Sequence, residues 1–235
     1  MTSAMNDGIV SRNFFGHFKN VFDPQLIRTL RDEAVSYNDE DHLKSAKESS
    51  ALKKDMGLAT DITRLRMRWF DLWRSAKRLP EIFGPYQWII YPIQIRLLET
   101  EAQMVPWHQD AGYQKRMGAR AHPRVVTCFI PLEDEPSKYA TLAFAKKASG
   151  ELEHNQVSFH GAVLKEKSFD FTYFNLDLGD CLVFGDHAIH QTYLPPGATL
   201  KRRTFEVRHV APAEALLDKD YFDLERMELV RKPHQ

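Results

Sequence analysis

VPWHQD at residues 105–110 places a histidine and a carboxylate two positions apart. Residues i and i+2 of an extended strand project from the same face, so His108 and Asp110 can reach one cation while Trp107 and Gln109 face the other way. Together they supply two-thirds of a metal site. Whether the stretch binds a metal therefore depends on whether another part of the chain supplies a second histidine.

A downstream motif, GDCLVFGDHAIHQT at residues 179–192, offers that histidine. Two histidines and one carboxylate with open coordination positions suit a non-haem Fe(II) centre. A His-x-acid triplet alone is weak support, because a chain with 10 histidines and 32 acidic residues contains about one by chance. The competing interpretation is a pair of capping residues and a core histidine.

An arginine follows the second motif on a strand predicted over residues 201–210. Arg203 alternates onto a largely apolar face with Phe205, Val207 and His209, which we take as the inward face. A buried cation is costly unless it is paired, and no carboxylate is adjacent in sequence. Since a guanidinium binds carboxylates bidentately, the pattern predicts an anionic ligand at Arg203.

Composition limits the class of protein. A chain of 235 residues with 43% hydrophobic residues fits a single domain spanning 1–235. Lys and Arg number 32, as do Asp and Glu, so a bulk electrostatic partner such as nucleic acid is not indicated. Cys128 and Cys181 lie in apolar runs without zinc-type spacing, and no run approaches a membrane span. We expect a soluble cytoplasmic protein, monomeric or homodimeric, without membrane or nucleic-acid partners.

The first part of the chain, residues 1–84, is predicted to be mostly helical. Asp23 caps an expected helix over 24–36, and a second apolar stripe over 61–79 ends at Pro80. Residues 39–56 are polar and predict either a solvated helix or a mobile flap. The last part, residues 211–235, is predicted to form a C-terminal helix.

The middle of the chain, residues 85–210, has the β-branched and aromatic pattern of strands. The run 124–132 predicts a strand buried on both faces or nearly so. Gln94 and Arg96 share one face, which is either a barrel interior where a ligand pairs them or a solvated outer face. The loop 113–124 carries four Lys/Arg and is either a cationic rim for an anionic substrate or a solvated loop.

The order of these motifs resembles one family. A helical N-terminal part is followed by W-H-Q-D (107–110), I-P-L-E-D (130–134), G-D-x-x-x-F-x-x-x-x-x-H-x-T (179–192) and R-R-T (202–204). This order is similar to that of the phytanoyl-CoA dioxygenase family of Fe(II)- and 2-oxoglutarate-dependent oxygenases, over about Phe14 to Val210. The resemblance implies a mainly β fold with flanking helices, a double-stranded β-helix or jelly-roll barrel of cupin type, with the N-terminal helices packed outside.

The resemblance also implies roles for individual residues. His108, Asp110 and His190 match the iron ligands, with His190 preferred to His187 because it lies eleven residues after Gly179. Arg203 matches the arginine that pairs with the distal carboxylate of 2-oxoglutarate, although Lys201 and Arg202 are close enough for a register error. Thr192 matches a hydroxyl residue that supports the same carboxylate, and Gln94 is a looser candidate for contacting cosubstrate or substrate.

The implied cofactors are Fe(II), 2-oxoglutarate as cosubstrate and O2. Decarboxylation of 2-oxoglutarate to succinate and CO2 would accompany hydroxylation of a C–H bond in a small-molecule metabolite. Because related halogenases carry a small residue at the position of Asp110, the resemblance predicts hydroxylation, or desaturation or cyclisation, in place of halogenation. The alternatives are a non-catalytic barrel and a cupin-type metalloenzyme that uses no 2-oxo acid.

Overall fold

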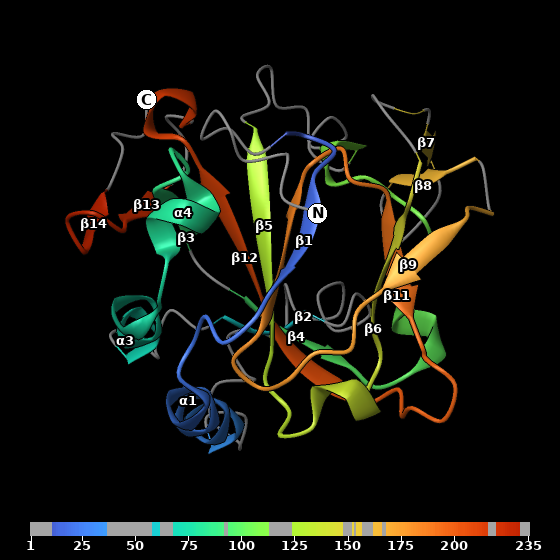
Figure 1. Cartoon of the computed structure of the whole chain (residues 1–235), viewed down its shortest axis with the longest axis horizontal. Coiled ribbons are helices and arrows are strands. Elements are labelled where there is room, and N and C mark those ends of the chain that lie inside the picture. The colour runs from blue at the N-terminus through green and yellow to red at the C-terminus, as the bar shows by residue number, and fades with distance from the viewer. Residues whose placement is uncertain are drawn as a thin grey trace.

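The computed structural model describes residues 11–36, 58–61, 68–91, 94–112, 124–147, 152, 154–156, 162–165, 168–215 and 220–230. Two main antiparallel sheets face each other, and the helices lie on the outer side of the larger one (Figure 1). The helices are α1 (Pro24–Ser36), α3 (Arg68–Ser75) and α4 (Leu79–Phe83). The predicted fold class, a mainly β jelly-roll with helices outside, is confirmed.

The larger sheet has nine strands in the order β1-β10-β5-β12-β3-β13-β14, with β4 paired to β12 and β2 paired to β4. These strands are β1 (Phe15–Phe18), β2 (Leu58–Asp61), β3 (Trp88–Tyr91), β4 (Gln94–Leu98), β5 (Val125–Pro131), β10 (Cys181–Gly185), β12 (Arg202–Val210), β13 (Asp220–Asp223) and β14 (Glu228–Val230).

The smaller sheet has the order β11-β6-β9 and stands opposite β5 and β10 (Figure 1). Its strands are β6 (Thr141–Ala145), β9 (Phe171–Tyr173) and β11 (His190–Tyr193). A separate pair joins β7 (His154–Gln156) to β8 (Ala162–Leu164).

Alternate residues of β5 enter two different cores. Phe129 packs between the sheets in a cluster that also contains Leu142, Phe144, Leu182 and Phe184. Val126, Cys128 and Ile130 of β5 face the helices instead. The core on that side also contains residues of α1, α3, α4 and β12, namely Ile27, Leu72, Phe83, Phe205 and Val207. Because both faces are covered, every residue of β5 is buried, as the apolar run predicted.

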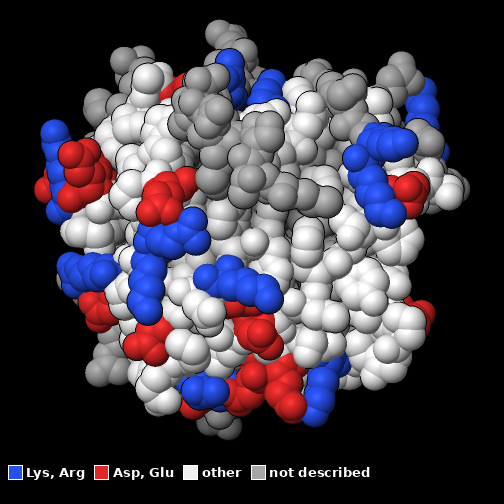
Figure 2. Space-filling view, in the orientation of Figure 1, with Lys and Arg blue, Asp and Glu red and all other residues white. Residues whose placement is uncertain are grey.

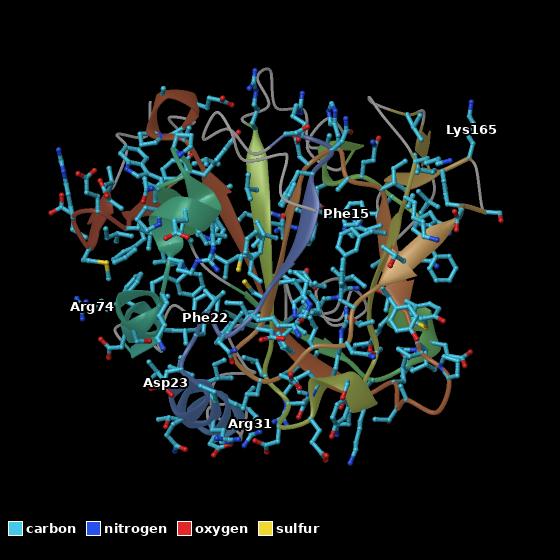
Figure 3. The ribbon with its side chains drawn as sticks, viewed as in Figure 1. Phe15, Phe22, Asp23, Arg31, Arg74 and Lys165 are labelled. Atoms are coloured by element: carbon cyan, nitrogen blue, oxygen red, sulfur yellow. The ribbon has the colours of Figure 1, made fainter. Side chains whose placement is uncertain are left out.

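The N-terminal segment contributes to both cores. Phe15 on β1 faces the smaller sheet and stacks on Phe144 with ring centroids 4.8 Å apart (Figure 3). Phe22, which precedes α1, packs on Trp73 at 5.2 Å. The predicted cap of α1 is confirmed, because the Asp23 carboxylate accepts the Gln25 N–H at 2.8 Å. Residues 1–10 and 37–57, including the expected flap at 39–56, lie outside the described residues.

Two predictions about the flanking segments are wrong. The C-terminal part forms β13 and β14, where a helix was predicted, because Tyr221 and Phe222 pair with Ile90 and Ile89 of β3 and bury their rings. Pro80 does not end the stripe predicted over 61–79 but stands in the first turn of α4. The front, which was predicted to be mostly helical, also contributes β1 and β2 to the larger sheet.

Charged side chains are interleaved over the surface. Figure 2 shows blue and red groups side by side, with no extended single-sign patch among the described residues of this face. The arrangement agrees with the equal numbers of basic and acidic residues. None of the described helices combines the length and apolarity that crossing a bilayer requires.

Candidate metal centre

The structure brings His108, Asp110 and His190 together in a buried cluster. Their ligand atoms all lie within 4.8 Å of one another. The Asp110 Oδ1 atom is 3.9 Å from the Nε2 atom of each histidine. Three donors converging on one point, all on residues less than 7% exposed, match the 2-His-1-carboxylate set that holds a divalent metal on one face.

The backbone fixes the distance between the two histidines. The N–H of His108 donates to the carbonyl of His190 at 2.9 Å, and the N–H of His190 returns a bond to the carbonyl of His108 at 3.0 Å. This antiparallel bridge joins the 105–110 stretch to β11, although 82 positions separate the two residues. One step along, the Val105 N–H donates to the Thr192 hydroxyl at 3.1 Å.

Each imidazole is oriented by a local carbonyl. The Nδ1 of His108 lies 2.8 Å from the carbonyl oxygen of Pro106, and the Nδ1 of His190 lies 2.9 Å from that of Ala188. A carbonyl only accepts hydrogen bonds, so each Nδ1 carries the proton and each Nε2 keeps its lone pair for a metal. Burial, reinforced by the neighbouring His190, lowers the pKa of His108 to about 3, which keeps the ring neutral.

The Asp110 carboxylate is oriented from β5. The Thr127 hydroxyl donates to Oδ2 at 2.9 Å, which leaves Oδ1 directed at the histidines. Burial acts to raise the pKa of Asp110, but the charge of Arg208, the two histidines and the Thr127 bond outweigh it and lower the pKa. The carboxylate is therefore ionised in the apoprotein. Sequence reasoning missed Thr127, whose hydroxyl is the one polar side chain in the run Val125–Pro131.

Trp107 and Gln109, which flank His108 in the sequence, support the site from the other face of the stretch. Gln109 is fully buried; its amide donates to the carbonyl of His187 at 2.7 Å and accepts from the Leu152 N–H at 2.9 Å. Trp107 packs on Phe169 with ring centroids 5.2 Å apart. The two metal-ligand segments are thus tied to each other by side chains that face away from the metal.

The structure corrects the surroundings predicted for Arg203. Its guanidinium forms a bidentate pair with Glu133, at 2.9 Å from Nε and 3.0 Å from Nη2, and its backbone N–H donates to the same carboxylate at 3.0 Å. Glu133 lies 70 positions away, so no local pattern could reveal the pair. The face that Arg203 was predicted to share with Phe205 and Val207 is the helix side of β12, outside the barrel.

Arg202 is the buried arginine of the barrel interior. The residue is 2% exposed, and its guanidinium carbon lies 4.9 Å from the centre of the Phe129 ring. Among the described residues, none of its three side-chain nitrogens has a hydrogen-bond partner. Burial, together with the charge of Arg96, lowers the pKa of Arg202 to about 9. The lining of the cavity beside Arg202 also includes Thr141 and Thr204, and the paired Arg203 and Glu133.

The other predicted site residues differ in burial and in the contacts that they make. Thr192 is buried on the same face of β11 as His190, with its hydroxyl on the Val105 N–H. Gln94 is paired through its backbone with Glu206, but its side chain lies outside the described residues. Its neighbour Arg96 is buried and contacts Glu206 at 3.3 Å. Of the cationic loop 113–124, only Arg124 is described.

Comparison with known proteins identifies the family. The sequence profile described as phytanoyl-CoA dioxygenase (PhyH) matches residues 12–194. This chain belongs to that family. The match covers the metal triad and ends before β12, so the family match itself does not include either arginine of that strand. No curated protein sequence matches the chain.

Solved structures share the fold at low sequence identity. The epimerase SnoN, in complex with Fe3+, alpha ketoglutarate and nogalamycin RO, has a TM-score of 0.52 at 11% identity, covering 85% of this chain and 79% of SnoN. The carbocyclase SnoK from nogalamycin biosynthesis has a TM-score of 0.51 at 10% identity, covering 95% and 90%. EvdO2 from Micromonospora carbonacea var. aurantiaca, complexed with 2-oxoglutarate, has a TM-score of 0.51 at 16% identity, covering 87% and 89%.

Proposed function

We propose that this protein is an Fe(II)- and 2-oxoglutarate-dependent dioxygenase that hydroxylates an unactivated C–H bond of a small metabolite. The observation that carries the proposal is the combination of a buried His108-Asp110-His190 triad with Arg202, a buried cation in the same barrel interior that has no hydrogen-bond partner among the described residues. The triad has the donor set of non-haem Fe(II) sites, and the arginine offers a binding partner for a dicarboxylate.

Three residues of the chain prepare the metal ligands. The carbonyls of Pro106 and Ala188 hold the two imidazoles in the tautomer that presents Nε2, and Thr127 holds the Asp110 carboxylate. Because the pKa of His108 is lowered to about 3, metal binding at neutral pH requires no proton release from that histidine. The backbone bridge between His108 and His190 keeps both rings in place before a metal arrives.

Arg202, and not Arg203, is the residue we assign to the distal carboxylate of 2-oxoglutarate. An unpaired guanidinium in this interior is unfavourable until an anion binds, and its planar fork matches a carboxylate. Thr192 lies two residues after His190 on the same buried face of β11, and we assign it to the same cosubstrate. Gln94 remains a candidate through its position on β4 beside Glu206.

When bound, Fe(II) and 2-oxoglutarate supply the oxidising chemistry, in which O2 is consumed and the cosubstrate is decarboxylated to succinate and CO2. The chain contributes positioning and exclusion of water. Phe144 and Phe184 pack on the His190 ring at 5.9 and 4.5 Å, so one side of the site is apolar and closed. This wall shields the reaction from solvent on the side of the smaller sheet.

The experiment is a screen of small metabolites for substrate-stimulated succinate formation by the iron-loaded protein, with products identified by mass spectrometry. We expect one class of metabolite to stimulate succinate formation and to gain one oxygen atom. Because SnoN and SnoK are named as an epimerase and a carbocyclase, a product of unchanged or reduced mass would replace hydroxylation by one of those outcomes. No succinate with any compound would contradict the proposal.

The alternative is a metal-binding barrel that does not use 2-oxoglutarate. Anaerobic addition of Fe(II) and 2-oxoglutarate separates the two functions, because chelation of the metal by the 2-oxo acid gives a visible charge-transfer band. We expect the band with the natural sequence. Its absence, with Fe(II) still bound, would favour the alternative.

We propose a single domain over residues 1–235 that works in the cytoplasm as a monomer or homodimer. Cys128 and Cys181 are free and buried, which supports a reducing compartment. The pairing of β1 and β13 with the central strands supports one domain.

A further inference from the structure

One face of β12 becomes more exposed from its first residue to its last. Arg202 and Thr204 are buried at 2% and 1%, Glu206 is half-buried, and Arg208 is exposed. These four residues alternate along the strand, so they lie in one row on the same face. Because Arg202 marks the barrel interior, the gradient shows that this row runs outward to an open end at Arg208.

The open end of the row is also the level of the metal centre. Arg208 is paired in register with Thr127 of β5, and the Thr127 hydroxyl holds the Asp110 carboxylate. Arg208 therefore stands beside the metal ligands. Its Cα is about 20 Å from that of Arg202 along the strand, at about 3.3 Å per residue, but the Arg202 side chain reaches Phe129, two residues from Thr127 on β5.

Apart from Arg202 at the closed end of the row, three described arginines of β12 and its surroundings are held by carboxylates, whereas Arg208 is not. Arg203 is paired with Glu133, Arg96 with Glu206, and Arg124 with Glu214. Within the part of the chain that the structure describes, no hydrogen bond or ion pair holds the guanidinium of Arg208. Its five N–H donors are available at the mouth of the barrel.

We propose that Arg208 binds an anionic group of the substrate, a carboxylate or a phosphate, and so places the reacting carbon over the metal centre. This inference rests on the proposed oxygenase function and narrows its substrate class to small anionic metabolites. Arg202 serves the cosubstrate at the closed end of the row, and Arg208 serves the substrate at the open end. A planar guanidinium suits both carboxylate and phosphate, and a panel with both kinds of compound shows which of the two Arg208 binds.

The test uses the iron-loaded full chain and a panel of carboxylic acids and phosphate monoesters. Each carboxylic acid is paired with its neutral methyl ester, and each phosphate monoester with its parent alcohol. We expect acids or phosphate monoesters to stimulate succinate formation and their neutral partners to be at least tenfold weaker. For the best compound, Arg208→Gln should raise the KM at least tenfold with a smaller change in kcat, and Arg208→Lys should recover part of the loss. The KM should also rise with added salt, because an exposed ion pair is screened.

The matched control is Arg74→Gln, which removes an exposed arginine from α3 on the helix side of the larger sheet (Figure 3). Its KM should equal that of the natural sequence. Stimulation by the neutral partners, or an unchanged KM in Arg208→Gln, would overturn the inference, as would a raised KM for 2-oxoglutarate alone. These outcomes presuppose the charge-transfer band and succinate formation of the natural sequence, and the absence of both would be failure of the proposed function instead.

Discussion

On one face of β12, Phe205, Val207 and His209 pack under the helices, whereas the opposite face carries Arg202, Thr204, Glu206 and Arg208. The first face resembles the core of any globular domain. The second is polar although two of its residues are almost fully buried. In this barrel the apolar face of a central strand therefore supports the fold from outside, and the polar face lines the interior where chemistry takes place.

The largest expected loss of activity comes from removing one of the metal ligands next to the polar face. His108→Ala removes one of three donors, and we expect succinate formation to fall by about a thousandfold or more, equivalent to about 4 kcal/mol. Thermal unfolding should show a folded protein, and Fe(II) titration should show weaker binding. The control His17→Ala removes a histidine that pairs with Asp180 and should keep metal binding. Full succinate yield from His108→Ala would refute the metal assignment.

Phe205→Ala tests the contribution of the apolar face to stability. The side chain is 1% exposed in the helix-side core, so its loss leaves a cavity, and we expect the free energy of unfolding to fall by about 3–5 kcal/mol. Denaturant unfolding of the apoprotein measures the effect. Phe205→Leu, which keeps most of the volume, should cost less than about 1.5 kcal/mol. If Phe205→Ala instead left stability intact and impaired only 2-oxoglutarate binding, the two faces would be assigned the wrong way round.

A third prediction compares the two adjacent arginines directly. Arg202→Gln should raise the KM for 2-oxoglutarate about a hundredfold, or about 3 kcal/mol, through loss of a charge-assisted bidentate contact. The stability of the apoprotein should not fall, because the variant removes an unpaired buried cation.

Arg203→Gln is the matched control for that comparison. It leaves the Glu133 carboxylate without its guanidinium partner, so we expect a loss of about 1–3 kcal/mol in the free energy of unfolding. The KM for 2-oxoglutarate should change less than about fivefold, or about 1 kcal/mol. A large rise in the KM for 2-oxoglutarate in Arg203→Gln, with little change in Arg202→Gln, would instead identify Arg203 as the cosubstrate ligand.

The sequence predicted the metal triad because its constraints are local in two short motifs. The i, i+2 spacing of His108 and Asp110 and the Gly-Asp turn before His190 depend on backbone geometry that a sequence displays. Gly179 has a φ of +103°, and a Cβ there would lie 2.7 Å from the carbonyl oxygen of Phe22, so this turn requires glycine. Alternation likewise identified two faces of β12.

What the sequence could not show was which face is the interior. Alternation of side chains defines two faces of a strand but does not show which face points into the barrel. The assumption that the apolar face points inward holds for a two-layer sandwich but not where helices cover the outer side of a barrel. The partner of Arg203 lies 70 positions away, and the hydroxyl that orients Asp110 comes from a strand that reads as purely apolar. The C-terminal strands were missed for a similar reason. The spacing of Leu217, Tyr221 and Leu224 fits a helical stripe, whereas in the structure Tyr221 pairs with Ile90 of β3.

The smallest predicted effect concerns His209, the histidine on the apolar face of β12. His209 is fully buried, with its ring stacked on Phe83 at 3.9 Å, and burial lowers its pKa to about 3. The unfolded chain protonates this histidine near pH 6.5 and the folded chain does not. Stability is therefore lost as pH falls below 6.5, by about 2 kcal/mol at pH 5.

His209→Phe removes that proton linkage while keeping an aromatic ring against Phe83. Denaturant unfolding at pH 7.5 and pH 5 should show that the natural sequence loses about 2 kcal/mol more than the variant over this interval. The contribution of the metal-site histidines is the same in both proteins and cancels in the difference. An equal loss in both would mean that His209 is protonated inside the folded protein. Water or an anion would then have to reach His209 on the helix-side face of β12.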